Sequence, residues 1–292
     1  MWGIRLSFGV YRLCGPIVLQ LFLYPIVTYY WLAKRSARQA SRDYLNKIAA
    51  LAPHSGIKGD AWNSYRHFLS FANAIIDKLA AWSGSLALDD VVYRGRTSLQ
   101  KDLQPGRGAL LLASHLGNLE VCRAIAVLDP ALKINVLVHT KHARKFNRLL
   151  SFYNAKSALN LMQVTEINAA TAMLLAEKIE HGELVIIAAD RTPVTNSRRV
   201  VQVDFLGAPA LFPQGGFILA ALLKCPVYLL FCLKEEQGYT IVFEHFGSAL
   251  RFPRAERERL IQEAAQRYAT RLQGYCLSHP LQWYNFYDFW GG

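Results

Sequence analysis

The stretch GALLLASHLGNLEVCRAIAVL, which runs from Gly108 to Leu128, decides the fold class that this sequence predicts. Its apolar run Ala109–Ala113 is typical of a buried strand, and an amphipathic helical pattern begins near Asn118. The residues between them predict a sharp turn, which leaves His115 where a central strand ends. Ligand sites of open α/β sheets lie at the ends of strands. The stretch therefore predicts an α/β fold with a functional site around His115.

An acidic residue, Glu120, follows His115 with the spacing His-x-x-x-x-Glu, and of the eight histidines only His115 has an acid five positions on. A histidine can move a proton near neutral pH, and a neighbouring carboxylate can fix its tautomer and stabilise its charged form. The spacing alone is equally compatible with a structural pair, in which Glu120 lies in a favourable first helical turn. A polar residue at the rim of an apolar core favours the catalytic interpretation, because structural residues there are more often apolar.

Length and composition limit the class of protein. The chain has 292 residues, 52% of them hydrophobic, which is enough for a short anchor and one large domain with a substantial core. The formal charge of +12 predicts anionic partners, such as a membrane surface, a phosphorylated substrate, an acidic protein or nucleic acid. The five cysteines form no C-x-x-C pair, so we interpret them as reduced thiols rather than as a disulfide framework or a metal site.

The N-terminal region carries an uncharged segment, residues 13–33, which would span roughly 30 Å as a helix, about one hydrocarbon core. Its aromatic end directly precedes Lys34 and Arg35, and basic residues are more frequent after the segment than before it. The positive-inside rule then predicts that the following domain faces the cytoplasm. Pro16 and Pro25 leave open a kinked or interfacial helix. We expect a hydrophobic membrane-anchor helix within residues 1–35 and a single domain over residues 36–292.

The rest of the chain predicts helices first and then alternating strands and helices. Residues 36–88 have helical patterns, with Asp60 as a plausible N-cap and an aromatic stripe that we interpret as core packing. The apolar runs that predict strands are Val91–Tyr93, Ala109–Ala113, Ile134–Val138, Leu159–Val164, Leu184–Ala189, Val201–Leu206, Val227–Leu233 and Thr240–Phe246. Helical patterns cover Leu119–Leu128, Arg144–Asn154, Ile167–His181, Gln214–Lys224 and Arg254–Leu277. The expected fold is a mixed, mostly buried sheet flanked by helices, whose last two strands form a hairpin.

Two further groups of charged residues follow predicted strands. Asp190 and Arg191 come directly after Leu184–Ala189, and an acid at that position is a candidate site residue, although charge at a strand end also arises simply where the chain emerges into solvent. Arg191 could bind a phosphate or carboxylate. The run after Val138 includes Lys141 and Arg144, which form either a solvated basic face or a patch for an anionic substrate.

Four blocks in this order resemble the bacterial lysophospholipid acyltransferase superfamily. They are the N-terminal hydrophobic segment, then QPGRGALLLASHLGNLEV, then LVIIAAD at a strand end, then FLGAPALFPQGGFILA. Within the superfamily the chain is most similar to the branch of the lipid A late acyltransferases, which transfer lauroyl and myristoyl groups. The similarity extends from about residue 8 to residue 280.

The resemblance implies a reaction and roles for particular residues. It implies that His115 removes a proton from an acceptor hydroxyl, that Glu120 supports the imidazole, and that Asp190 lies near the acceptor. It also implies an acyl thioester donor on acyl carrier protein or CoA, a lipid or glycolipid acceptor, no cofactor or metal, and a location at the bacterial inner membrane facing the cytoplasm. A tetrahedral oxyanion needs donors, and the amides of Gly117 and Asn118 are near enough to be candidates.

The sequence departs from the lipid A enzymes in two regions. Those enzymes usually carry an arginine where this chain has His139-Thr140-Lys141, so Lys141 or Arg144 is the nearest substitute. Their C-terminus usually has a tryptophan followed by basic residues, whereas residues 282–290 here are aromatic and acidic. Aromatic faces suit apolar or sugar-like surfaces, and an acid there would repel a phosphate. We therefore expect an amphipathic hydroxylated acceptor other than the usual lipid A precursor.

Two other functions remain open at this point. A hydrolase could use the same histidine and glutamate to activate water on a thioester or lipid ester, although the absence of a G-x-S-x-G motif disfavours a serine esterase. A non-catalytic membrane-binding homologue would also suit the basic charge. Nucleic-acid binding has little support beside a membrane segment and a buried α/β core.

Overall fold

A computed structural model describes residues 21–83, 91–103, 106–119, 133–138, 159–163, 169–191 and 199–291. Within these ranges the chain forms a seven-stranded sheet in the order β1-β9-β8-β2-β5-β3-β4. The strands are β1 (Val91–Arg94), β2 (Leu110–Gly117), β3 (Ile134–Val138), β4 (Leu159–Gln163), β5 (Leu184–Ala188), β8 (Val227–Lys234) and β9 (Tyr239–Gly247). All neighbouring strands are parallel except the β8–β9 hairpin, so the predicted mixed sheet and its final hairpin are confirmed.

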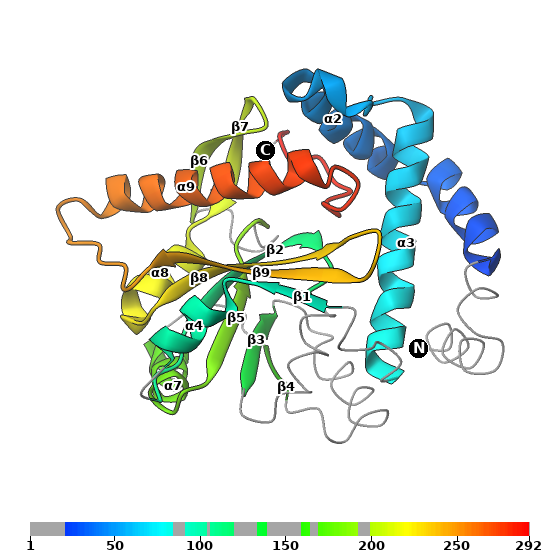
Figure 1. The fold of residues 1–292 in the computed structure, drawn as a ribbon. Coiled ribbons are helices and arrows are strands. Elements are labelled where there is room, and N and C mark those ends of the chain that lie inside the picture. The colour runs from blue at the N-terminus through cyan, green and yellow to red at the C-terminus, as the bar shows by residue number, and fades with distance from the viewer. Residues whose placement is uncertain are drawn as a thin grey trace.

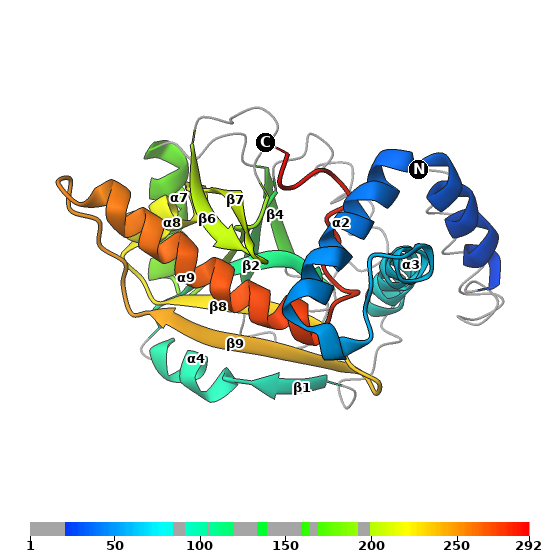
Figure 2. The same ribbon diagram turned by 90° about the horizontal axis from the view of Figure 1, so that it is seen from above.

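Side chains on both faces of this sheet are buried, as expected of a largely parallel sheet. Leu110 and Leu112 of β2 belong to one core cluster, which also contains residues of α7 (Ala169–Glu180), α8 (Gly215–Leu223) and α9 (Arg257–Ser278). Leu111 and Ala113 belong to a second cluster with Leu99 of α4 (Arg96–Asp102), because successive side chains of a strand point to opposite faces. Figures 1 and 2 show α9 running along the sheet on the side that also carries β6 and β7.

Two elements are additions to the predicted set. A second strand, β7 (Ala208–Pro213), pairs antiparallel with β6 (Val200–Phe205) in a two-stranded sheet of their own, and α4 was not predicted. Leu206 and Gly207 make the tight turn between β6 and β7 with positive φ angles. Strand β7 was not predicted because its two prolines disfavour a strand. A two-stranded ribbon tolerates them, because each strand has one edge without a hydrogen-bonding partner.

Strand β2 is longer than predicted. It continues through Gly117, whereas the sequence predicted a turn from Ser114 onward. Its pairing with β8 shifts on the way, since Ala113 lies opposite Leu230 and Gly117 lies opposite Cys232. Extra residues in one strand form a bulge, and bulges often re-aim a side chain beside an active site. His115 therefore lies in a bulged extension of the central strand rather than in a loop after it.

Helices α2 (Arg35–Leu51) and α3 (Ala61–Ser83) stand beside the edge of the sheet where β2 ends (Figure 1). Asp60 caps α3 as predicted, because its Oδ1 accepts a hydrogen bond of 2.7 Å from the amide of Asn63. The interpretation of the aromatic stripe as core packing is wrong in part. Within that stripe Trp62 is 64% exposed and Ile75 is 46% exposed, whereas the polar His67 on the same helix is fully buried.

Residues 21–33 form a helix that packs on α3. The indole N–H of Trp31 donates to Ser64 Oγ over 3.2 Å, and the Trp31 and Tyr65 rings are 5.9 Å apart. The described part of the chain contains no helix that is both long enough and apolar enough to cross a bilayer. The first 20 residues of the predicted anchor, and the predicted helices of residues 120–128 and 144–154, lie outside the described residues.

Candidate active site

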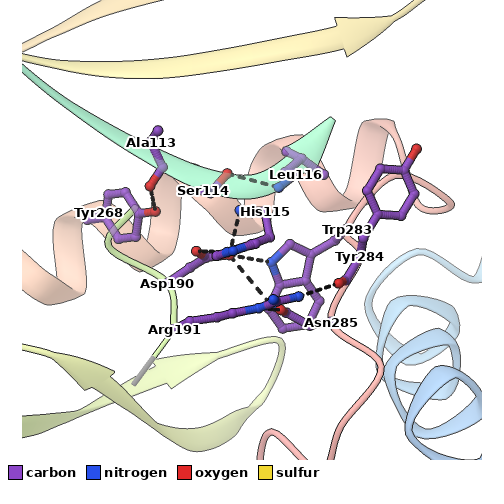
Figure 3. Close-up of polar contacts among 10 residues, drawn as sticks. All are labelled: Ala113, Ser114, His115, Leu116, Asp190, Arg191, Tyr268, Trp283, Tyr284 and Asn285. Atoms are coloured by element: carbon purple, nitrogen blue, oxygen red, sulfur yellow. Dashed lines mark hydrogen bonds and ion pairs between the residues drawn. The ribbon is translucent and has the colours of Figure 1, made fainter. Parts of the chain in front are cut away.

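The site is built around the contact between His115 and Asp190 (Figure 3). Asp190 follows β5, which pairs with β2, so both side chains lie at the carboxyl ends of adjacent strands in the middle of the sheet. The imidazole Nδ1 lies 2.7 Å from Asp190 Oδ1. The histidine side chain is 33% exposed, whereas the carboxylate is 0% exposed. The pair thus has a buried acid and an imidazole that solvent or substrate can reach.

Asp190 is surrounded by hydrogen-bond donors. Its Oδ2 accepts from the backbone amide of His115 at 2.8 Å, from Trp283 Nε1 at 3.0 Å and from Asn285 Nδ2 at 3.5 Å. Burial by itself would raise the pKa of the carboxyl group, but the charge and hydrogen bonds of His115 lower the pKa of Asp190 below its ordinary value. The acid is therefore ionised, and His115 Nδ1 must carry the hydrogen that it donates to Oδ1.

This arrangement leaves the other imidazole nitrogen available. No described residue hydrogen-bonds His115 Nε2, which lacks a proton in the neutral tautomer that Asp190 selects. A nitrogen with a free lone pair on a partly exposed ring can accept a proton from a bound molecule. The described geometry is that of a general base oriented by a buried carboxylate.

The C-terminal segment completes the site. Leu116 and Trp283 form an isolated antiparallel bridge. The amide of Tyr284 donates to the carbonyl of His115 at 3.0 Å, and the amide of Gly117 donates to the carbonyl of Gln282 at 2.8 Å. This short pairing extends the sheet edge and brings the Trp283 and Asn285 side chains onto Asp190 (Figure 3).

Sequence reasoning missed Trp283 and Asn285 as site residues. It interpreted the aromatic tail as a surface for the acceptor, but Trp283 is 0% exposed and Phe289 is also buried in the core. That interpretation is corrected for these two rings, because they pack against Phe205 and each other inside the protein. The indole N–H of Trp283 was the one signal in the sequence, because a buried indole usually donates a hydrogen bond to an acceptor such as a carboxylate.

Arg191 is tied to the same segment. Its Nε donates to Asn285 Oδ1, and its guanidinium also donates to the carbonyl of Tyr284 at 2.5 Å. Burial lowers the pKa of Arg191, while the charge of Asp190 opposes this effect. The guanidinium lies 5.7 Å from the centre of the Tyr287 ring. The structure therefore shows Arg191 holding the tail, and its predicted contact with substrate stays a prediction.

The amides of Gly117 and Asn118 are not free donors. Gly117 donates to Gln282 as described, and the amide of Asn118 donates to the carbonyl of Cys232 at 2.8 Å. The side chain of Asn118 donates to the carbonyl of Ala74 in α3 at 2.8 Å. The interpretation of these two N–H groups as an oxyanion hole is thus corrected, because the bulge directs them into the protein.

Several predicted residues cannot be placed. Glu120, Lys141 and Arg144 lie outside the described residues, so their predicted roles stay predictions. Among the residues that the structure describes, no group of three or more histidine, cysteine or acidic side chains could hold a metal ion.

A hollow of about 750 Å³ between α2 and the C-terminus is lined by Lys47, Leu206 and Trp290 among others, and contains neither His115 nor Asp190.

Together, the largely parallel sheet and the partly exposed imidazole held by a buried carboxylate describe an α/β protein whose site has the groups that a proton transfer needs. A model of the bacterial lipid A biosynthesis acyltransferase family matches residues 68–290, which is more than half of the chain, and the chain belongs to this family. The resemblance noted in the sequence is thus confirmed. The protein is an acyltransferase, and its family implies an acyl donor and a lipid acceptor. No curated protein matches the chain.

Proposed function

We propose that this protein is a membrane-associated O-acyltransferase that moves a fatty acyl group from an acyl thioester to a hydroxyl of a lipid or glycolipid, with His115 as general base. The observation that carries the proposal is the His115–Asp190 pair. Asp190 is fully buried and ionised, and it holds Nδ1 of an imidazole that remains one-third exposed. Such a pair can deprotonate an alcohol without becoming covalently attached to the acyl group.

In the proposed reaction the acyl group passes directly from the thioester to the acceptor hydroxyl. His115 Nε2 takes the proton of the acceptor hydroxyl while the hydroxyl oxygen attacks the thioester carbonyl carbon. The tetrahedral intermediate then collapses with cleavage of the carbon–sulfur bond, and the proton passes from Nε2 to the departing thiolate. The products are an ester and a free thiol, and the histidine returns to its starting tautomer.

Asp190 has a positioning role in this scheme. It keeps the hydrogen on Nδ1 so that Nε2 faces the substrate as a base, and its charge stabilises the imidazolium that forms when the hydroxyl proton arrives. Glu120, five positions beyond His115 in the sequence, is the second carboxylate that we propose for the reaction. In the family resemblance Glu120 supports the imidazole, and the observed Asp190 contact supports a carboxylate in that role.

Association with the inner membrane, with the domain on the cytoplasmic side, is also part of the proposal. Helix 21–33 carries exposed apolar and aromatic side chains, and α3 adds others beside it. They are Leu21, Phe22, Tyr24, Ile26, Tyr29, Tyr30, Leu32, Trp62, Phe71 and Ile75. Apolar side chains that gather on neighbouring helices are typical of a surface that enters the interface of a bilayer. The excess of basic residues after residue 33 supports the cytoplasmic orientation.

The substrates are proposed by charge and by family. A net charge of +12 suits an acidic acyl carrier protein or the phosphates of CoA, and Lys141 and Arg144 are proposed contacts for an anionic group. The acceptor is a hydroxylated amphipathic lipid. With Trp283 and Phe289 buried, the argument for an acceptor other than the usual lipid A precursor now rests on the His139-Thr140-Lys141 departure and on Asp288.

Thiol release from a fatty acyl thioester tests the proposal, with the full chain reconstituted in vesicles and with or without a total bacterial lipid extract. We expect thiol release to require the extract and a new acylated lipid to be found by mass spectrometry. His115→Ala should reduce the rate about 100-fold or more, the scale of a lost general base. His181→Ala, at an exposed histidine in the turn directly after α7, is the matched control and should keep the wild-type rate.

Two outcomes would lead to the other candidate functions. Release of free fatty acid at the same rate without any acceptor would identify a hydrolase that uses the pair to activate water. A folded His115→Ala protein with the wild-type rate would remove the histidine from the chemistry. Purified lipid A precursor, tested beside the total extract with the same donor, distinguishes an ordinary late acyltransferase from one with a different acceptor.

A further inference from the structure

A second histidine, His67, is fully buried where α2, α3 and the C-terminal segment meet. Its Nδ1 lies 3.1 Å from Ser41 Oγ on α2, and its Nε2 lies 3.0 Å from the backbone carbonyl oxygen of Trp283. Phe286 and Tyr44 pack against the imidazole with ring centres 4.6 Å and 5.5 Å away. His67 plays no part in the proton transfer described above, yet it contacts the segment that completes the site.

These contacts fix the tautomer of His67. A carbonyl oxygen can only accept, so Nε2 carries the hydrogen and donates it to Trp283, while Nδ1 accepts the hydroxyl hydrogen of Ser41. Both nitrogens are thus satisfied, which removes the cost of burying a polar ring. The ring contacts the site through the hydrogen bond from its Nε2 to the backbone carbonyl of Trp283.

Trp283 connects His67 to the His115–Asp190 pair. Its carbonyl is held by His67, and its indole N–H donates to Asp190 Oδ2 at 3.0 Å. Asp190 in turn accepts the Nδ1 hydrogen of His115 through its other oxygen. Three hydrogen bonds therefore connect a buried residue of α3 to the imidazole at the end of β2. The first two are donated from His67 and Trp283 toward Asp190, and the third is donated to Asp190 by His115.

We propose that His67 is a positioning residue for the His115–Asp190 pair and acts through Trp283. The inference rests on the proposed function of His115. Since a carboxylate that shifts by a fraction of its hydrogen-bond length no longer holds the base in its reacting orientation, loss of the His67 restraint reduces the rate of the chemical step more than it reduces donor binding.

Site-directed variants of the full chain in vesicles test this role through kcat and KM. His67→Phe keeps an aromatic ring in the cage but removes both hydrogen bonds, and we expect kcat to fall about 10-fold while the KM for the acyl thioester changes little. His67→Gln keeps an N–H that can reach the Trp283 carbonyl and should recover most of kcat. Tyr228→Phe, which removes a hydroxyl bonded to Asp102 at the other end of β8, is the matched control and should keep kcat.

Coupling to Asp190 separates positioning from a general loss of stability. In an Asp190→Asn background, His67→Phe should reduce kcat much less than in the wild type, because the contact that it supports is already lost. An equal reduction in both backgrounds, or an unchanged kcat in folded His67→Phe, would overturn the inference. If His67→Phe does not fold, Ser41→Ala takes its place, with a lowered kcat expected and an unchanged kcat contradicting the role.

The two proposals fail in different ways. If His115→Ala keeps its activity, the proposed function is wrong. If His115→Ala is inactive while the His67 and Ser41 variants keep the wild-type kcat, only the positioning role is wrong.

Discussion

Trp283 donates its indole N–H to the carboxylate of Asp190 over 3.0 Å, although the two residues are 93 positions apart in the chain. The contact places a core aromatic residue directly behind the acid that orients the proposed base. The same residue pairs with Leu116 through its backbone, so the tail follows the contour of the bulged strand. The C-terminal segment is therefore part of the site and not merely a cover over the core.

Removal of this indole donor should impair catalysis with little change in packing. In Trp283→Phe the buried, ionised carboxylate of Asp190 loses one hydrogen bond. Hydrogen bonds to charged groups contribute about 1.5–3 kcal/mol, so we expect kcat to fall about 10-fold or more. Trp290→Phe, which loses an indole bond to the carbonyl of Phe205, is the matched control and should keep kcat. Steady-state kinetics and thermal unfolding of both variants check this, and equal kcat losses would contradict it.

Two carboxylates compete for the role of partner to His115. In Asp190→Asn a neutral amide replaces the carboxylate that accepts hydrogen bonds from His115 and Trp283. We therefore expect kcat/KM to fall about 100-fold, comparable to the loss of the base itself. Glu120→Ala should give a milder or comparable loss. The rates of acyl transfer by the two folded variants decide between them. An inactive Glu120→Ala beside a fully active Asp190→Asn would show that the observed Asp190 contact is not the productive one.

The sequence predicted that His115 and Asp190 lie near the ends of strands, because each comes at the end of a buried apolar run. It did not predict that the two would touch, since that depends on β2 and β5 being neighbours, and strand order is set by long-range packing. The predicted turn after Ala113 failed for a related reason. The chain from Ser114 to Gly117 stays extended because β8 and the tail provide backbone partners that local sequence does not reveal.

Most strands and helices of the described residues were predictable, and the predictions failed where local propensity misleads. The helix α3 buries His67 and exposes Trp62, the reverse of what hydrophobicity predicts, because His67 finds two partners and Trp62 lies on the outer face. The sequence predicted that the tail meets the acceptor, because it is aromatic and acidic where the lipid A enzymes are basic. The Trp283 and Phe289 rings instead pack against Phe205 of β6 and Phe212 of β7 in the core.

Gly117 is required by the bulge that presents His115. Its φ of 71° lies in the left-handed region, and a Cβ there would overlap the carbonyl oxygen of Cys232. Gly117→Ala should therefore lower the free energy of unfolding by about 1–3 kcal/mol or more and reduce activity. Gly274→Ala in α9 has open space around the added methyl and should raise stability by about 0.5–1 kcal/mol. Denaturant unfolding of the two variants measures these opposite signs, and a stable Gly117→Ala protein would refute the strain argument.

The exposed apolar face of helix 21–33 should control binding to membranes. Tyr29→Ser together with Leu32→Ser removes two exposed apolar side chains, and at about 0.8 kcal/mol per buried CH₂ the pair should weaken vesicle binding at least 10-fold. Met173→Ser on α7, where the side chain is 74% exposed, is the matched control. Sedimentation with anionic vesicles checks this. Equal weakening by Met173→Ser, or none by the pair, would place the binding surface elsewhere.

The buried His67 also predicts how stability depends on pH. Burial lowers the pKa of His67 to about 4, against a small opposing effect of the Trp283 carbonyl. The neighbouring Tyr44 and Tyr284 do not titrate in this range, since burial raises the pKa of both hydroxyls. In the unfolded chain the imidazole has its ordinary pKa near 6.5, so as the pH falls below that value the unfolded state binds a proton that the folded state does not.

The stabilising effect of a neutral His67 is therefore complete above about pH 6.5 and is lost as the pH falls toward 4. At one pH unit per 1.36 kcal/mol the total loss is about 3 kcal/mol. His67→Phe has no proton to bind, so its free energy of unfolding should fall less over the same interval than that of the wild type. Urea unfolding of both proteins at several pH values between 4 and 7 measures the difference. Parallel pH dependences would mean that the folded state takes up this proton over the same pH interval as the unfolded state. The hydrogen bond in which Nδ1 accepts from Ser41 would then have to be reversed, because a protonated imidazole can only donate.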